Sequence, residues 1–454
     1  MPGPPSTRPG PGAGIHGPYG RAPAAPHPGA IDVPGGPPGG RLSRRRFLAL
    51  GAGLAAAGAL GATLGPRAFD ELTGSPGAAA PAAPARHLVV LTLYGGNDGL
   101  NTVVPYQDPA YQAARGALAI AADTVLPLGQ GFGLHPGLTG LARRWRDGHL
   151  AVVHGVGFAD PNYSHFESMD IWQSGVPGEP VATGWLGRWL DTTGADPLRA
   201  VAVGPTVPPL MTGARVQAVA LPIGPLVLPG GDQRHRFVEL AATGAHRAPL
   251  DAQAVRSDSA LLAADEAFGP LLRAQRAPAG TASSLAIADG GGGRSGGDVL
   301  ATQLSLVANL IVGGAPARAY SVELGGFDTH SDQAPTQAAL LAQLDQGLTS
   351  FLDAVEAHPG GRGTVVLVCT EFGRRLQANA SAGTDHGWAN VALVAGLPVK
   401  GGFYGEPPSL TALSDGNPVF TTDFRSLYAT VLTGVLGVEA TPILGARVPT
   451  LGFL

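Results

Sequence analysis

Short apolar runs alternate with longer stretches of helical periodicity from residue 87 onward. The apolar runs are rich in β-branched residues and end at Gly or polar residues, which is typical of buried strands. They cover residues 87–93, 150–156, 200–203, 319–324, 364–370 and 390–395. Residues 299–312 and 337–357 carry apolar side chains at helical spacing instead. This alternation predicts an α/β fold with a mainly parallel central sheet and helices on both faces.

The body of the chain shows no clear internal repeat. We therefore expect residues 86–454 to form a single domain. Two stretches differ in composition from the rest. Residues 201–231 are rich in Pro and Val and predict an insertion with short strands, while residues 277–297 are rich in Gly and Ser and predict a mobile surface loop.

The N-terminal stretch predicts an export signal. Residues 1–41 are rich in Pro, Gly and Ala without periodicity, so we expect them to be disordered. Ser43-Arg44-Arg45-Arg46-Phe47-Leu48 matches the twin-arginine pattern, and the uncharged residues 49–64 follow it. We interpret residues 42–85 as this signal and an Ala/Pro linker.

This signal predicts a periplasmic or extracellular protein. It meets the twin-arginine translocase during export and the membrane only transiently. The apolar run is short and rich in Ala and Gly, so a removed signal fits better than a membrane span. The alternative is an uncleaved anchor that holds the protein at a lipid surface, because no single cleavage site stands out in residues 77–85.

Composition excludes several classes of function. With 29 Lys and Arg against 33 Asp and Glu, the net charge is -4, which gives no basic field for nucleic-acid binding. The single cysteine, Cys369, excludes a disulfide within the chain and a zinc cluster built from cysteines. Any metal must therefore be held by His and carboxylate side chains.

Acidic residues and histidines follow the predicted strands. Ligands of open parallel sheets bind beyond the carboxyl ends of the strands, so turns that follow several strands can share one crevice. A fourth turn of this kind lies just before the last predicted strand. Their carboxylate and imidazole groups suit one or two Zn, Mn or Mg ions. The candidate metal ligands are Asp98, Asp328, His330, Glu371, Asp385 and His386.

Each of these residues also has a simpler interpretation. Asp98 in a Gly-rich turn can bond its own backbone, and Asp328 can cap a helix. Glu371 can pair with Arg374 or Arg375 at the surface. Four independent turns with ligand-capable residues nevertheless favour a shared site.

Ser164 and His165 are the candidate catalytic residues outside these turns. They follow the strand at 150–156 and precede a helical stretch, so Ser164 would lie at a helix start. There its hydroxyl could be deprotonated by a metal and attack an ester. The alternative is that Ser164 is an N-cap and that Glu167 completes a capping box.

The motifs together resemble a known family. They are SRRRFLAL, LYGGNDGLNTVVPY, LHPGL, NYSHFESMDIWQSG, GWLGRWLD, GGFDTH, TEFGR and TDHG, in order from residue 43 to residue 387. The chain resembles a large uncharacterised family of twin-arginine-exported bacterial proteins related to the alkaline phosphatase and sulfatase superfamily. The resemblance implies an alkaline-phosphatase-like fold in which Asp98 binds metal, Asp328 and His330 belong to one metal site and Glu371 to the other. His386, with Asp385 nearby, would complete the pair, and Ser164 would be the nucleophile.

The chain departs from the superfamily pattern at several positions. Phe372 follows Glu371 where such enzymes often carry a His, which puts the second metal in doubt. Cys369 lies in a predicted strand without a Cys-x-Pro-x-Arg element, which argues against formylglycine and ordinary sulfatase chemistry. Arg375 and Leu376 replace the family's usual Thr-Pro.

Two functions compete. The first is an exported metal-dependent hydrolase of phosphoesters or related anionic esters, small or derived from the envelope. In this enzyme Arg374 or His165 would stabilise the transferred group. The second is a non-catalytic envelope protein that keeps the fold and binds a ligand or partner.

Overall fold

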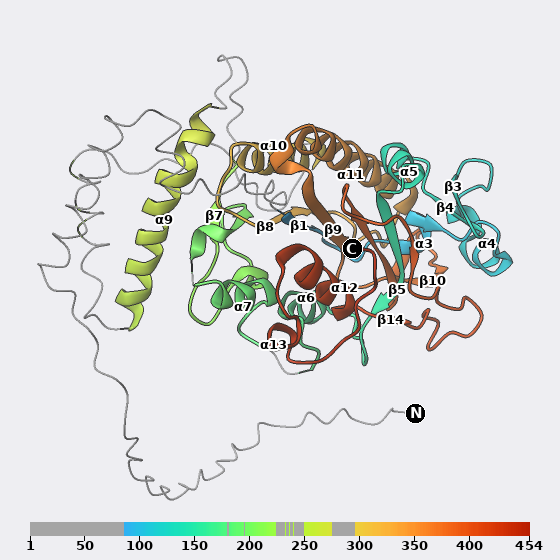
Figure 1. Cartoon of the computed structure of the whole chain (residues 1–454). Coiled ribbons are helices and arrows are strands. Elements are labelled where there is room, and N and C mark those ends of the chain that lie inside the picture. The colour runs from blue at the N-terminus through green and yellow to red at the C-terminus, as the bar shows by residue number, and fades with distance from the viewer. Residues whose placement is uncertain are drawn as a thin grey trace, which may run out of the picture. The chain divides into compact units, whose positions relative to one another are not determined.

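A large twisted sheet forms the centre of the fold (Figure 1). The computed structural model describes residues 86–178, 181–194, 196–223, 249–274 and 296–454 and the single residues 232, 236 and 239. The strand order is β13 (Gly402–Tyr404), β5 (Leu150–Gly157), β12 (Asn390–Ala395), β9 (Gly363–Cys369), β1 (Arg86–Leu93), β8 (Ala319–Leu324), β6 (Ala200–Val203) and β7 (Val219–Leu221). A ninth strand, β14 (Thr422–Asp423), pairs with β5. The predicted extension and signal, residues 1–85, lie outside the described residues.

Strand directions give the sheet its mainly parallel character. β1 pairs in parallel with both β8 and β9, and β6 pairs in parallel with β7 and β8. β12 is the exception, because it runs antiparallel to both of its neighbours, β9 and β5. The strands that the apolar runs predicted are all present, and the predicted mixed α/β fold with a mainly parallel sheet is confirmed.

Helices cover both faces of the sheet (Figure 1). One face packs against α5 (Thr139–Arg146), α9 (Pro249–Ala274), α10 (Gly296–Val312) and α11 (Gln333–Glu356). The other face packs against α6 (His165–Ser174), α7 (Trp185–Thr192), α12 (Arg425–Val431) and α13 (Thr441–Leu444). None of the helices in the described ranges is long and apolar enough to cross a membrane.

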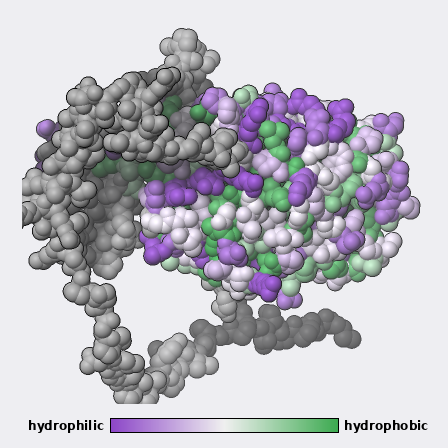
Figure 2. Space-filling model, in the orientation of Figure 1, coloured by the Kyte–Doolittle hydropathy of each residue, from purple (hydrophilic) through white to green (hydrophobic). Residues whose placement is uncertain are grey.

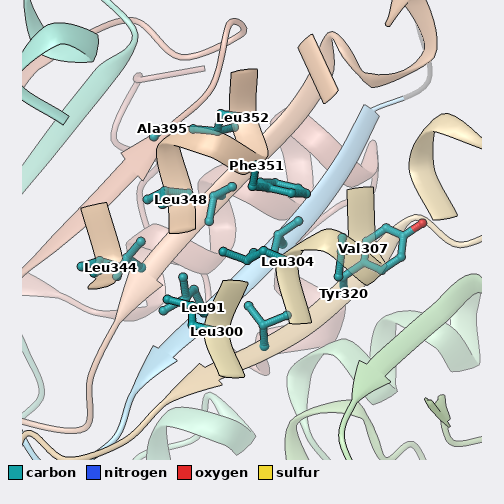
Figure 3. Packing of buried hydrophobic residues seen from close by; sticks show 14 of the residues in the cluster. Leu91, Leu300, Leu304, Val307, Tyr320, Leu344, Leu348, Phe351, Leu352 and Ala395 are labelled. Atoms are coloured by element: carbon teal, nitrogen blue, oxygen red, sulfur yellow. The ribbon is translucent and has the colours of Figure 1, made fainter. Parts of the chain in front are cut away.

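Alternation along β1 divides the buried side chains between two cores. Val89, Leu91 and Leu93 point into the core under α10 and α11, while Leu88 and Val90 point into the other. Successive side chains of a strand face opposite sides of a sheet, so a continuous apolar run is what a strand covered on both faces requires. Figure 3 shows the first core, where Leu91 packs among leucines of α10 and α11.

The spacing of apolar side chains explains why the segment of α11 is helical. Four of its buried leucines, at positions 341, 344, 348 and 352, recur at spacings of three and four residues and form one stripe. The solvent side of α10 and α11 is mainly hydrophilic at the upper edge of Figure 2. The mobile loop predicted at 277–297 lies outside the described residues except for its last two positions, which begin α10.

Smaller elements lie around the sheet. They include α3 (Gly99–Thr102), α4 (Pro109–Arg115), the antiparallel pair β10 (Arg374–Ala378) and β11 (Thr384–His386), and the three-stranded group β2 (Val103–Val104), β4 (Phe132–Leu134) and β3 (Leu126–Gly129). Short helical turns occur at η1 (Gly116–Leu118), η2 (Pro197–Arg199), η3 (Pro209–Met211), η4 (Pro359–Gly361) and η5 (Leu432–Leu436).

Candidate functional site

The carboxyl ends of β1, β5, β8 and β9 lie at one edge of the sheet. These four strands run in the same direction, since β12 is antiparallel to both β5 and β9. For the same reason the beginning of β12, and with it the preceding strand β11, lies at this edge too. The turns that carry the predicted site residues are thus brought together, as the sequence predicted for open α/β sheets.

Asp328 lies at the centre of the site, surrounded by three imidazole rings. Its Oδ1 atom is 3.0 Å from Nε2 of His386 and 3.0 Å from Nε2 of His330, and its Oδ2 atom is 3.5 Å from Nε2 of His165. The Nε2 atoms of His330 and His386 are 2.9 Å apart. Ligand atoms of His165, Asp328 and His386 all lie within 4.8 Å of one another, which makes a possible metal site.

The opposite ring nitrogen of each histidine is held by an oxygen atom. Nδ1 of His165 is 2.8 Å from Oε1 of Glu371, Nδ1 of His386 is 2.8 Å from the carbonyl oxygen of Tyr163, and Nδ1 of His330 is 3.2 Å from Oδ1 of Asp385. A carbonyl oxygen can only accept, so Nδ1 of His386 donates. An acceptor at Nδ1 leaves the lone pair of Nε2 facing the centre, which is how metal-binding histidines are oriented in proteins.

The carboxylate of Asp328 is the charged group at the centre of the site. Burial by itself would raise the pKa of Asp328, but the contacts with His386 and the Arg374 guanidinium outweigh it and lower this pKa to about 2. Burial also lowers the pKa of His386. An ionised carboxylate therefore faces imidazole nitrogens at 3.0 Å, a contact that is favourable when the ring nitrogen carries a proton or when a metal ion lies between the groups.

Glu371 is buried and supports the site from behind. It is 1% exposed, and its Oε1 atom accepts from the backbone N–H of Gly95 at 2.8 Å in addition to contacting His165. Its Oε2 atom accepts from the Thr370 hydroxyl at 2.7 Å. The structure places Glu371 beside the far nitrogen of His165, and places Asp385 in the same way beside His330.

Arg374 is fully enclosed by protein oxygen atoms. Its guanidinium donates to the backbone carbonyls of Gly96 at 2.6 Å, Thr384 at 2.8 Å and Phe327 at 2.9 Å, and also to that of Gly95. It further donates to Oδ1 of Asp328 at 2.9 Å. The side chain predicted to stabilise a transferred group thus lies behind Asp328, where it orients this carboxylate.

Asp98 is not among the converging side chains. Its carboxylate pairs with the buried guanidinium of Arg115 and accepts from Nε2 of Gln333 at 2.6 Å. Oδ1 also caps α3 by accepting from Leu100 N–H at 3.2 Å. Gln333 in turn accepts from the Thr384 hydroxyl at 2.6 Å, so Asp98 supports β11 from a distance.

Ser164 is the N-cap of α6. Its hydroxyl oxygen accepts from Glu167 N–H at 3.4 Å, as the capping alternative predicted, but the Glu167 carboxylate bonds Nδ2 of Asn162. The residues on either side of Ser164 both touch the cluster, Tyr163 through its carbonyl oxygen and His165 through its ring. The structure thus places Ser164 at the edge of the site.

Sequence reasoning missed two contributors to the site. Tyr163 acts through its backbone carbonyl, which has no signature in a sequence. Phe372 is 2% exposed, and its ring packs 4.8 Å from that of His165 and 4.7 Å from that of His386. The departure at Phe372 thus supplies a packing surface for two of the imidazoles, and its aromatic character is the signal that could have indicated this.

One protein family matches part of this chain. The family described as "Protein of unknown function (DUF1501)" matches residues 225–441, just under half of the chain and including the turns of Asp328, Glu371 and His386. This confirms the resemblance to a family of unknown function that the motifs indicated. No curated protein matches the chain.

Several solved structures are distantly similar to this chain. A protein in the alkaline phosphatase superfamily from Vibrio parahaemolyticus is 12% identical with a TM-score of 0.37, and the alignment covers 80% of this chain and 73% of that one. Alkaline phosphatase from the Antarctic bacterium TAB5 is 8% identical with a TM-score of 0.33, covering 79% of this chain and 99% of that one. Phosphonoacetate hydrolase from Sinorhizobium meliloti 1021 is 14% identical with a TM-score of 0.29, covering 64% and 57%. Identities this low give no information about substrate or activity.

The pairing of Asp98 with Arg115 predicts a large loss of stability in Asp98→Asn. Both side chains are fully buried, so the substitution leaves a buried guanidinium without its counter-charge. We expect the free energy of unfolding in urea to fall by about 3–5 kcal/mol. The control is Asp415→Asn, whose carboxylate is 71% exposed and pairs with Arg375 at 3.2 Å. Its loss should stay below about 1 kcal/mol, and equal losses in the two variants would contradict the structural role of Asp98.

Proposed function

We propose that the chain is an exported metal-dependent hydrolase of phosphoesters or related anionic esters. The observation that carries this proposal is the arrangement around Asp328. Three imidazoles present Nε2 to one carboxylate while each Nδ1 is held by an oxygen atom. An arrangement of this kind orients ligands for a divalent metal ion.

The side chains fit zinc or manganese better than magnesium. Zinc accepts imidazole and carboxylate ligands, while magnesium prefers an all-oxygen shell. Asp328, His165, His330 and His386 would hold the ion. Glu371, Asp385 and the Tyr163 carbonyl would fix the three rings from behind. Because several of the acidic groups would orient histidines and would not bind metal themselves, the described part of the site supports one ion per chain rather than two.

The residues around the cluster suggest how an ester would react. A bound divalent ion would polarise the ester and lower the pKa of a coordinated hydroxyl group or water. Ser164 is the nucleophile in this proposal. In the described contacts its oxygen only accepts a long hydrogen bond, so its proton is available for removal. Attack on phosphorus would form a bond to the serine oxygen and release the alcohol, and water would then hydrolyse the phosphoserine.

The start of α6 would stabilise the anionic group during this reaction. Ser164 precedes a ten-residue helix whose first N–H groups point toward its N-terminal end. Such groups and the helix dipole favour negative charge. Arg374 would act on Asp328 and leave the substrate to the helix and the metal, because its donors are bonded to protein oxygens.

A non-catalytic binding protein is the second candidate, and two observations favour it. Ser164 serves as a helix cap, which is a sufficient structural reason for a serine at this position. Arg375, which is partly exposed beside Tyr163, is occupied by Asp415 and by the ring of Tyr163 at 5.6 Å. This protein would keep one metal and bind an anionic or envelope-derived ligand without turnover.

Metal content tests the centre directly. We expect elemental analysis of protein purified without chelators to find about one divalent ion per chain, because one set of convergent ligands, His165, Asp328 and His386, is present in the described residues. His386→Ala and His165→Ala should each lose it. The control His358→Ala lies on the exposed surface away from the cluster and should retain it. Absence of metal under metal-replete conditions would favour a binding protein without a metal, and retention in both cluster variants would contradict the ligand assignment.

Hydrolysis separates the two candidate functions. We expect the metal-loaded protein to hydrolyse p-nitrophenyl phosphate or its diester, and Ser164→Ala to lower kcat by roughly 10³-fold or more while keeping the metal. Glu371→Ala should also lose activity, since the His165 ring then lacks the carboxylate that orients its Nδ1 atom. Saturable ligand binding without turnover of any ester class would support the binding protein instead. Unchanged hydrolysis in Glu371→Ala and His386→Ala would exclude this centre.

Export depends on residues outside the described part of the chain. We expect the double variant Arg44→Lys, Arg45→Lys to remain in the cytoplasm while the wild type is exported, because the twin-arginine translocase requires both guanidinium groups. Cell fractionation measures this. N-terminal sequencing of the exported wild type distinguishes a removed signal from a retained anchor, and equal export of both proteins would contradict the proposed route.

A further inference from the structure

Four arginines begin neighbouring strands at the edge of the sheet opposite the candidate site. Arg86 is the first residue of β1, and Arg199, Arg318 and Arg362 directly precede β6, β8 and β9. These strands are neighbours in the order β9, β1, β8, β6 and run parallel, so their amino ends lie at one edge. Adjacent strands are about 4.8 Å apart, so the four positions form a row of roughly 15 Å, the arginine row.

Backbone hydrogen bonds place three of these residues side by side. The N–H of Arg318 donates to the carbonyl oxygen of Arg199 at 2.8 Å, and the Arg318 carbonyl accepts from Leu88 N–H at 2.9 Å. The Nε atom of Arg318 also donates to the Arg86 carbonyl, and its guanidinium donates to the carbonyl of Val435 at 3.0 Å. The fold therefore fixes the half-buried Arg318 between Arg86 and Arg199.

The positive charges of the arginine row are not neutralised within the described part of the chain. Burial lowers the pKa of Arg318, and repulsion by the guanidiniums of Arg199 and Arg86 lowers it further. None of the four arginines forms an ion pair with a carboxylate of the described residues. Arginine stays protonated in proteins, so neighbouring guanidiniums without a counter-charge attract an external anion.

Two acids that shortly precede members of the row in the chain are bonded elsewhere. Asp196 caps η2 by accepting from Leu198 N–H at 3.0 Å. Glu356 forms an ion pair with Arg144 at 2.6 Å. Neither carboxylate is thus engaged with the row.

Arg86 and Arg362 are exposed and can offer donors at the surface. Among the described contacts, the Arg86 guanidinium donates from one nitrogen to the carbonyl of Gly434, and Nε of Arg362 donates to the carbonyl of Glu356 at 3.3 Å. The other nitrogens of these two side chains have no partner among the described residues. An anion at the surface can therefore accept from them.

We propose that the arginine row binds the anionic headgroups of a lipid bilayer. A row along a sheet edge meets a plane of headgroups at several points at once, whereas one small anion needs donors that converge on it. The position also fits, because Arg86 joins the described chain to the predicted export signal and linker, and that signal meets a membrane.

A bilayer bound in this way leaves the candidate metal site free. The eight residues of β1 separate the arginine row from the turns of the cluster by roughly 25 Å. The cluster would therefore face away from the membrane. The proposal does not depend on the hydrolase function, since the cluster takes no part in it.

Sedimentation of the full chain with lipid vesicles tests the proposal. We expect stronger binding to vesicles of phosphatidylcholine mixed with phosphatidylglycerol than to phosphatidylcholine alone, and loss of this difference at high salt, because salt screens the attraction. The double variant Arg86→Gln, Arg362→Gln should weaken binding to the anionic vesicles roughly 25-fold, about fivefold for each lost charge.

The matched control is the double variant Arg375→Gln, Arg425→Gln. It removes the same charge from the opposite edge of the sheet, where these arginines pair with Asp415 and Asp423. Vesicle binding should be as in the wild type. Residues 1–85 are identical in all of these proteins, so a difference between variants reports on the row itself.

The single variant Arg362→Glu decides the question if the double variant fails to fold. Its reversed charge should weaken binding to the anionic vesicles at least about fivefold. Equal binding of the wild type to both kinds of vesicle, or wild-type binding by the Arg86→Gln, Arg362→Gln and Arg362→Glu variants, would overturn the proposal. Saturable binding of inorganic phosphate at these arginines without binding to anionic vesicles would also overturn it, in favour of a soluble anion.

Discussion

The buried guanidinium of Arg374 is the group on which the geometry of the site depends. A cation removed from water must have its donors satisfied, and here the partners are the backbone carbonyls of the turns after β1 and β8, the carbonyl of Thr384 in β11 and the carboxylate of Asp328. One side chain thus fixes three separate segments relative to each other. The turn after β1 must approach closely for this to happen. A Cβ atom at Gly95 would lie 2.4 Å from the backbone nitrogen of Asp328, and Gly95 has a φ of +114°, so only glycine fits.

With these turns fixed, the acidic residues divide into different tasks. Asp328 alone among the predicted acids lies in the centre of the three imidazoles, and its carboxylate is 48% exposed and accessible to a ligand. Glu371 and Asp385 hold the far nitrogens of His165 and His330, which sets the direction of each ring. Asp98 is farther back, paired with Arg115. In the proposed metal centre the ligands would therefore be mainly imidazoles with one carboxylate, a set that suits zinc or manganese better than magnesium.

Asn390, at the start of β12, holds two of the turns at the site. Its amide group donates to the carbonyls of Asn97 and Phe372, which flank the buried carboxylates Asp98 and Glu371 in sequence. The space next to it is tightly filled, since a Cβ atom at Gly99 would lie 2.1 Å from the Asn390 side-chain oxygen. Asn390 thus connects the turn after β1 with the turn after β9.

The sequence by itself determined which segments form strands and helices, and which turns follow the strands at their carboxyl ends. Continuous apolar runs such as that of β1 require a strand covered on both faces, and the leucine stripe of α11 requires a helix with one buried side. Those local patterns predicted the mixed α/β fold and gave the candidate ligands Asp98, Asp328, His330, Glu371, Asp385 and His386. Only the tertiary structure decided the rest. His386 comes before its strand, and it reaches the site because β12 runs antiparallel, which pairing and not periodicity determines. Whether Arg374 faces a substrate or is enclosed by carbonyl groups, and whether an acid binds a metal or orients a histidine, depends on which segments pack together. Burial and partner atoms are properties of contacts between residues distant in the chain, so no local pattern encodes them.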